Sequence, residues 1–258
     1  MLAQCNDIVV RYEIDGPASA PAVVFSHSLG VSLEMWQPQL ERLADRCRIV
    51  RYDTRGHGES AVEPGPYSID DLGGDAIALL DHLGIEKAHF CGLSMGGVIG
   101  QWLGIHAPGR LHSLVLASTA AKIGTVESWN ARIATVEREG LGAVIPGTLE
   151  RWFTADFRSR HEDVVQHVEA LLRKTQPEGY LGCCAAIRDA DFRSAAATIA
   201  VPTLLLAGSH DPVITSTDMR SLAASIAGAK YVELDAAHLS SVETAGEFTA
   251  ALQSFWKL

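Results

Sequence analysis

A serine set between small residues is the first feature of this sequence that could do chemistry. Residues 92–96 read Gly-Leu-Ser-Met-Gly; they follow a short apolar run at 88–92 and precede a helix-like stretch at 98–106. A serine on a sharp strand-to-helix turn needs small flanking residues, and such a turn lifts the hydroxyl into a cleft. Ser94 is therefore a candidate nucleophile for acyl transfer, and a glycine-rich turn at a helix start is the competing interpretation.

A serine hydroxyl needs a histidine to take its proton and a carboxylate to orient that histidine. Of the ten histidines, His238 alone follows the last apolar run of the chain, at 231–234. Asp211 follows the preceding apolar run, so both side chains would emerge at the same end of a parallel sheet. We predict that Ser94, Asp211 and His238 form a catalytic triad, with Asp235 as the alternative acid.

Two backbone N–H groups are predicted to stabilise the oxyanion that forms when a carbonyl is attacked. Met95 stands at the start of a helix, where N–H groups lack partners and the helix dipole is positive. Leu29 lies in the segment that follows the early apolar run at 22–25. The hydroxyl of Ser28 is expected to contact the substrate or to satisfy the backbone, and His27 to hydrogen-bond beneath the site.

A polar segment at 53–60, Asp-Thr-Arg-Gly-His-Gly-Glu-Ser, is predicted to be a turn in which Asp53 pairs with Arg55. The sequence has neither an H-E-x-x-H motif nor a G-x-x-x-x-G-K-[ST] motif. We therefore expect no metal, nucleotide or other cofactor.

The elements that must position these residues alternate between strands and helices. One alternating run at 8–14 is followed by short runs that are apolar at nearly every position, at 22–25, 49–52, 88–92, 114–117, 203–207 and 231–234. Such runs are typical of strands covered on both faces, and helix-like segments lie between them. One such segment starts at Ser68 with a possible capping box to Asp71 and stops at Gly84. The sequence predicts an α/β protein with a doubly wound, mostly parallel sheet.

The alternation breaks between about 121 and 195, where helix-like stretches rich in Trp, Arg and Glu replace the strands. Pro202 is placed to begin the strand that resumes the pattern. We interpret the break as an inserted helical cap at 122–195 on a core formed by 1–121 and 196–258.

The composition of the chain limits the classes of binding partner and the cellular compartment that we expect. Lys and Arg number 21 against 31 Asp and Glu, a formal charge of -10, which disfavours nucleic acid and anionic membranes as partners. The five cysteines show no C-x-x-C spacing, so neither a disulfide framework nor a zinc site is indicated. Without an N-terminal signal pattern or an apolar stretch long enough to span a bilayer, the chain is expected to be an unprocessed cytoplasmic protein.

With these residues in hand, the sequence resembles the 3-oxoadipate enol-lactonase family of α/β hydrolases over nearly its whole length. The serine motif and the turn at 53–58 are shared by the superfamily, whereas the cap segments are more discriminating. The resemblance is carried by residues 27–30, 51–58, 65–69, 89–97, 150–154, 185–191 and 236–240.

The resemblance implies an α/β-hydrolase fold and a cofactor-free, acyl-enzyme opening of 3-oxoadipate enol-lactone to 3-oxoadipate in aromatic catabolism. The partner would be a small anionic lactone, and the protein a monomer or small homo-oligomer. Because the substrate carries a carboxylate, a cap arginine should hold it, with Arg132 preferred, then Arg188, then Arg151. Trp129 would wall the pocket or pack the cap.

The sequence is also compatible with other functions. One is a different carboxylesterase or lactonase, or a carbon-carbon bond hydrolase, on the same scaffold. A ligand-binding receptor of hydrolase fold is a more distant alternative, disfavoured by an intact triad. Haloalkane dehalogenases and epoxide hydrolases are disfavoured because their nucleophile is aspartate.

Overall fold

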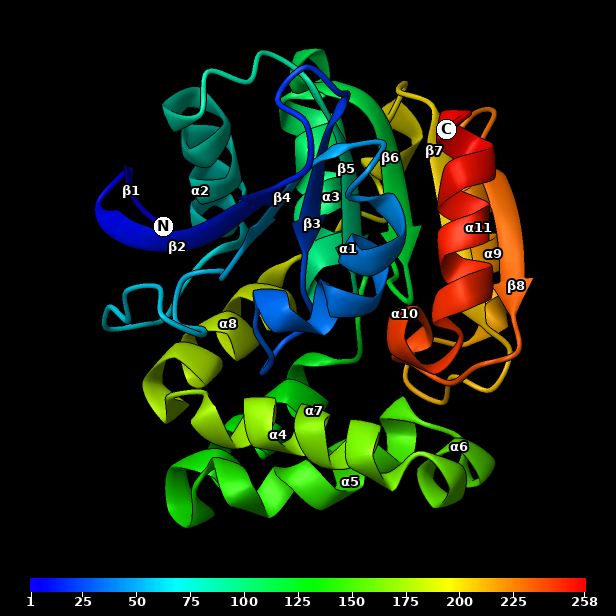
Figure 1. Ribbon diagram of the computed structural model, residues 1–258. Helices are drawn as coiled ribbons and strands as arrows, with labels where there is room; N and C mark the ends of the chain where they lie inside the picture. Colours follow the sequence, from blue (N-terminus) through cyan, green and yellow to red (C-terminus); the bar gives the residue numbers. More distant parts are fainter.

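A computed structural model describes residues 1–258, and one eight-stranded sheet runs through it (Figure 1). The strands lie in the order β1-β2-β4-β3-β5-β6-β7-β8. Strands β1 and β2 pair antiparallel with each other, β2 pairs antiparallel with β4, and all remaining pairs are parallel. The strands are β1 (Leu2–Cys5), β2 (Ile8–Asp15), β3 (Ala22–Ser26), β4 (Arg48–Tyr52), β5 (Ala88–Leu93), β6 (Leu111–Ala117), β7 (Thr203–Gly208) and β8 (Lys230–Leu234). The prediction of a mostly parallel α/β sheet is confirmed.

Strand β1 was not predicted. It has four residues with only Ala3 and Cys5 turned inward, so its alternation is too short to distinguish from a loop. It is held as an edge strand by pairing with β2.

Helices cover both faces of the sheet. Helices α1 and α11 pack on one face with η1 and α10, and α2, α3 and α9 lie on the other (Figure 1). The core helices are η1 (Leu33–Trp36), α1 (Gln37–Leu43), α2 (Ile69–His82), α3 (Met95–His106), η2 (Pro108–Arg110), η4 (Ala196–Thr198), α9 (Ser216–Ser225), α10 (Ser240–Glu243) and α11 (Ala245–Trp256). Each face has its own buried apolar layer, which is why the strands are apolar at nearly every position.

The start of α2 is as predicted from its cap. The Ser68 hydroxyl accepts from the Asp71 N–H, while the Asp71 carboxylate accepts from the Ser68 N–H, which forms a capping box. Gly84, with φ of 63°, follows the helix in a conformation that favours glycine.

Between β6 and β7 the chain leaves the sheet and forms only helices. In Figure 1 α4 to α7 make a separate layer beyond the ends toward which β6 and β8 point, and α8 lies between this layer and the sheet. These helices are α4 (Val126–Glu139), η3 (Leu141–Val144), α5 (Ile145–Trp152), α6 (Ala155–Arg160), α7 (Glu162–Lys174) and α8 (Pro177–Asp189). We refer to α4–α8 as the cap helices; where a cap domain begins and ends stays a prediction.

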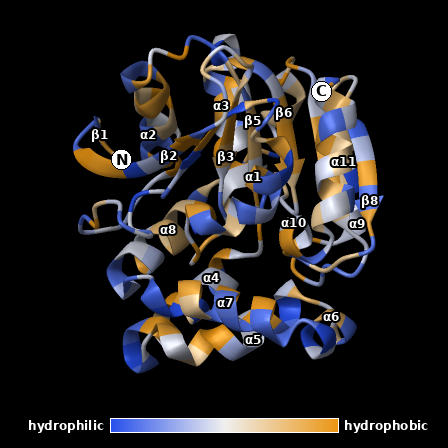
Figure 2. Ribbon diagram, viewed as in Figure 1, coloured by the Kyte–Doolittle hydropathy of each residue, from blue (hydrophilic) through white to orange (hydrophobic).

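Hydropathy separates the two layers. Figure 2 shows hydrophobic residues concentrated in the central strands, whereas α4 to α7 alternate between hydrophilic and hydrophobic residues. That alternation is typical of helices that bury one face and expose the other. No helix in the chain combines the length and the apolar character needed to cross a bilayer.

Candidate active site

Ser94 sits on a strained turn between β5 and α3. Its φ of 56° and ψ of -110° are unusual for a non-glycine residue, and such conformations cluster at functional sites. A Cβ on Gly92 would lie 2.0 Å from the Gly96 carbonyl oxygen, and one on Gly96 would lie 2.1 Å from the Ser26 carbonyl oxygen. Only glycine fits at both positions, so the flanking residues of the motif are explained by backbone contact.

Asp211 and His238 meet at the ends of β7 and β8. His238 Nδ1 lies 2.7 Å from Asp211 Oδ2, and both side chains are almost completely buried. The other carboxylate oxygen of Asp211 accepts from the N–H groups of Val213 and Ile214, at 2.7 and 3.0 Å. These bonds fix the carboxylate, which in turn leaves His238 Nε2 as the ring nitrogen available to another group.

One cavity of about 70 Å³ brings these groups together. Ser94 and His238 line it from the sheet side, with Ser28 and Leu29 beside them. Burial of Ser94 and His238 removes water from both, which strengthens electrostatic interactions inside the site. A small carbonyl compound placed here would face both Ser94 and His238.

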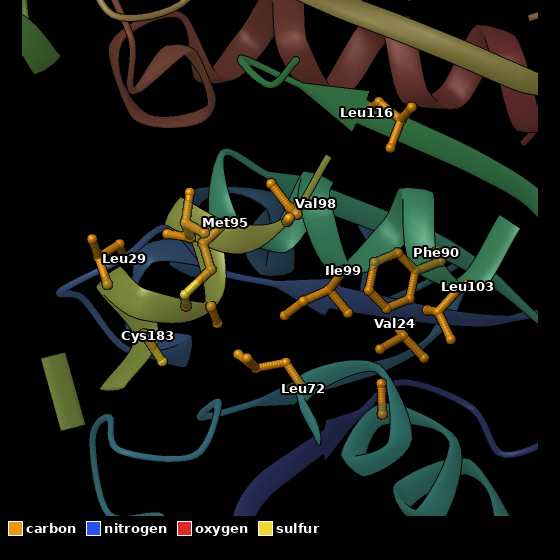
Figure 3. Packing of buried hydrophobic residues seen from close by; sticks show 14 of the residues in the cluster. Val24, Leu29, Leu72, Phe90, Met95, Val98, Ile99, Leu103, Leu116 and Cys183 are labelled. Carbon is orange, nitrogen blue, oxygen red and sulfur yellow. The ribbon is translucent and has the colours of Figure 1, made fainter. Parts of the chain in front are cut away.

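The role of the Leu29 and Met95 N–H groups as oxyanion donors stays a prediction, and the surroundings of both groups are compatible with it. Leu29 lies in the loop after β3 and its N–H donates to no other group of the protein. Met95 opens α3, where the first N–H groups have no acceptor within the helix. Figure 3 shows the Met95 side chain turned into the apolar layer near Leu29 and Cys183 of α8.

Two neutral histidines brace this loop from beneath. His57 Nε2 accepts from the Gly30 N–H at 2.8 Å, and His27 Nε2 accepts from the Thr54 N–H at 3.0 Å. Burial lowers the pKa of His57 to about 3 and that of His27 to about 4, so both rings keep an acceptor nitrogen. The predicted role of His27 beneath the site agrees with this geometry.

The roof of the cavity comes from the cap helices. Trp129 and Arg132 of α4 line it together with Arg151 and Trp152 of α5. Arg132 Nε donates to the Tyr180 hydroxyl at 2.6 Å, and its Nη2 donates to the Thr148 hydroxyl at 3.0 Å.

Neither cavity arginine is neutralised. No carboxylate oxygen lies within 4.0 Å of the guanidinium of Arg132 or Arg151. Burial and the neighbouring positive charge of Arg132 lower the pKa of Arg151. Two partly buried cations without a carboxylate partner give this cavity a local positive charge.

Comparison with known proteins places the chain in a family. Residues 21–176 match the alpha/beta hydrolase fold family. The chain is 43% identical over 252 residues to "3-oxoadipate enol-lactonase 2" of Acinetobacter baylyi, covering 98% of this chain and 94% of that relative. The chain belongs to the 3-oxoadipate enol-lactonase family of α/β hydrolases. Within that family, the crystal structure of the enol-lactonase from Burkholderia xenovorans has a TM-score of 0.98 to this structure at 43% identity, with 100% of both chains covered.

The fold is also shared more widely. A thermophilic esterase from Thermogutta terrifontis has a TM-score of 0.92 at 27% identity, covering 97% of this chain and 93% of the esterase.

Three expectations within this enol-lactonase fold need correction. Arg188 does not line the cavity; its guanidinium pairs with Asp189 and donates to the side chain of Asn130. It lies in the last turn of α8, where these two neighbours satisfy its charge and its donors. A cation already paired on the surface is poorly placed to hold a substrate carboxylate.

The alternative acid is also excluded by geometry. Asp235 is almost fully exposed and its carboxylate pairs with His210, 2.8 Å away, rather than with His238. The predicted Asp53–Arg55 pair is wrong as well. Arg55 pairs with Asp75, and the Asp53 carboxylate accepts from the N–H groups of Leu33 and Glu59.

Of the α5 residues that line the cavity, the sequence predicted only Arg151 as a candidate and missed Thr148 and Trp152. Spacings of three and four residues put them on one face of the helix, and this pattern was available in the sequence. The pattern alone does not indicate a functional site, because the same spacing is typical of an ordinary buried helix face.

The chain contains no group of three His, Cys, Asp or Glu side chains arranged to bind a metal ion.

Proposed function

We propose that this protein hydrolyses 3-oxoadipate enol-lactone to 3-oxoadipate through an acyl-enzyme formed on Ser94. The observation that carries the proposal is the pair of unneutralised arginines, Arg132 and Arg151, in the same cavity as Ser94 and His238. In a chain with a net charge of -10, such a cavity favours a small anionic ester over a neutral one. Because the chain belongs to the enol-lactonase family, we propose that this anionic ester is 3-oxoadipate enol-lactone.

Acylation would begin with attack of Ser94 Oγ on the lactone carbonyl carbon while His238 Nε2 accepts the hydroxyl proton. Asp211 holds the imidazole in the tautomer that leaves Nε2 unprotonated and stabilises the imidazolium that forms. The N–H groups of Leu29 and Met95 would donate to the oxyanion. Collapse breaks the ring carbon–oxygen bond, His238 returns its proton to the leaving oxygen, and the resulting enol becomes a ketone.

Deacylation would use the same groups in the opposite sense. A water molecule gives its proton to His238 and attacks the acyl carbon, and Ser94 Oγ leaves with the proton from His238. The product is a free carboxylate and the regenerated serine, so no cofactor is required. The carboxylate that the substrate already carries would lie against Arg132, with Arg151 adding positive charge and Trp129, Trp152 and Ser28 bounding the site.

A neutral-ester hydrolase is the second candidate, because the fold is shared with a thermophilic esterase. The test is to follow loss of the enol-lactone chromophore with purified protein, beside a neutral nitrophenyl ester and a carbon-carbon hydrolase substrate. Turnover of the lactone with kcat/KM at least about 100-fold above that of the neutral ester is expected. Turnover confined to the neutral ester would replace the proposal with this second function.

The proposal includes the cytoplasm as the working compartment and a monomer or small homo-oligomer as the working form. All five cysteines are buried and unpaired, which fits a reducing environment. No nucleic acid or membrane partner is proposed.

A further inference from the structure

The carboxylate of Glu243, the last residue of α10, joins two segments that are distant in the sequence. Its Oε2 accepts from the Ala237 N–H at 2.8 Å. Its Oε1 accepts from both the N–H and the hydroxyl of Thr154, the N-cap residue that precedes α6 in the cap. Three donors therefore converge on one side chain.

Both segments lead directly to the active site. Ala237 immediately precedes His238, and Thr154 follows closely after Trp152, whose ring centroid is 6.2 Å from that of His238. The N–H of Leu239 donates to the Trp152 carbonyl at 3.0 Å, so the cap is tied to the chain on both sides of the histidine. On the Ala237 side, the hydrogen-bonded link to the cap runs through the Glu243 carboxylate.

We propose that Glu243 is a positioning residue that sets the catalytic histidine against the cap. This inference rests on the proposed role of His238 as the base. Glu243 does not line the cavity, so it acts through the Ala237–His238 backbone and through Thr154. A base displaced by a fraction of an ångström transfers protons less efficiently, even when substrate still binds.

The chemistry of the contact requires a carboxylate. Each of its two oxygens accepts from a different segment, whereas glutamine offers one oxygen and turns an NH₂ group toward a donor. Glu243→Gln can therefore satisfy one segment only, and Glu243→Ala satisfies neither. On the cap side, Thr154→Val removes the hydroxyl and Thr154→Ser retains it as the matched control.

The experiment measures kcat and KM for the enol-lactone and for a neutral nitrophenyl ester, with melting temperatures to establish that each variant is folded. Glu243→Ala should lower kcat by about 100-fold on both substrates with KM within about threefold, and Glu243→Gln by about 10-fold. Thr154→Val should lower kcat by about 10-fold, Thr154→Ser should restore it, and Thr154→Val should add nothing to Glu243→Ala. The downfield proton resonance of the His238–Asp211 hydrogen bond should shift or broaden in Glu243→Ala.

Values of kcat within twofold of wild type in the Glu243 variants, with an unchanged downfield resonance, would overturn the inference. So would fully additive losses in the double variant. Should Glu243→Ala fail to fold, the Glu243→Gln, Thr154→Val and Thr154→Ser variants decide the question. Failure of the wild type on the lactone alone would overturn the proposed function, because the neutral ester still reports on the position of His238.

Discussion

The floor and the roof of the cavity are built differently. On the floor, Ser94, Asp211 and His238 each follow a parallel strand, and backbone groups fix the serine turn and the carboxylate. On the roof, Arg132 and Arg151 extend from helices, and Arg132 is held by contacts between side chains. Under the proposed function, the sheet positions the reacting groups, whereas the cap helices carry the side chains that select the substrate. Arg132 and Arg151 take no part in the contact between Glu243 and Thr154, so they could be exchanged without disturbing the floor.

The largest expected effect is on the floor. Ser94→Ala should lower kcat/KM for the lactone by about 10⁴-fold or more, because triad members act as a unit. The chromophore assay measures the loss, and an unchanged melting temperature shows that the fold survives. Activity near that of the wild type would show that the floor does not contain the nucleophile.

The buried histidines His27 and His57 beneath the floor should make the stability of the protein fall in acid. In the folded chain the pKa values of His27 and His57 are about 4 and about 3, against 6.5 for an ordinary histidine. Below pH 6.5 the unfolded chain therefore binds more protons, and the free energy of unfolding falls by up to roughly 1.4 kcal/mol per pH unit for each ring. Urea unfolding at about pH 6.5 and about pH 5 measures this slope.

His57→Gln is the matched variant for that measurement, because it removes one titrating ring. It should reduce the slope by about a third relative to wild type, because His89, with a pKa of about 4, contributes alongside His27 and His57. An identical slope in the variant would mean that His57 is not held neutral by the fold.

The roof should act on binding rather than on chemistry. Arg132→Ala should lower kcat/KM for the lactone by about 10- to 100-fold through KM, the value of one charge-assisted hydrogen bond, and should spare a neutral nitrophenyl ester. Arg188→Ala is the control, since that residue lies outside the cavity and should change either activity by less than about twofold. Equal losses on both substrates for Arg132→Ala would move the carboxylate site to Arg151.

The smallest effect is expected where one roof residue supports another. Tyr180→Phe removes the acceptor of the Arg132 Nε–H bond, so KM for the lactone should rise by about 2- to 10-fold. Steady-state kinetics on both substrates measures the change. A matching rise for the neutral ester would indicate a general disturbance of the cap instead of a loosened Arg132.

The same contrast explains how much the sequence could predict. The parallel sheet and the places of Ser94, Asp211 and His238 were predictable, because short apolar strands and small turn residues are local signals. The distinction between Arg132 and Arg188 was not. Both are helix arginines in the sequence, and only tertiary contacts show that one faces a cavity while the other pairs with Asp189.

Long-range partners were equally out of reach. Arg55 was matched to its neighbour Asp53, yet it pairs with Asp75 on another element. Nothing in the sequence distinguishes Glu243, because an acidic residue on a short helix is ordinary until its partners are known. The partner of a carboxylate is set by which groups lie near it in the folded chain. A sequence pattern predicts only partners that lie within a turn or two of the same helix.

The departure of the chain from the sheet between β6 and β7 has a consequence for how the protein can change over time. These two strands are neighbours and pair in parallel, although the segment 118–202 separates them. The entropy of closing such a loop grows only with the logarithm of its length, by about 0.6 kcal/mol for each doubling. Lineages can therefore lengthen, shorten or exchange this segment at little cost to the pairing of β6 with β7.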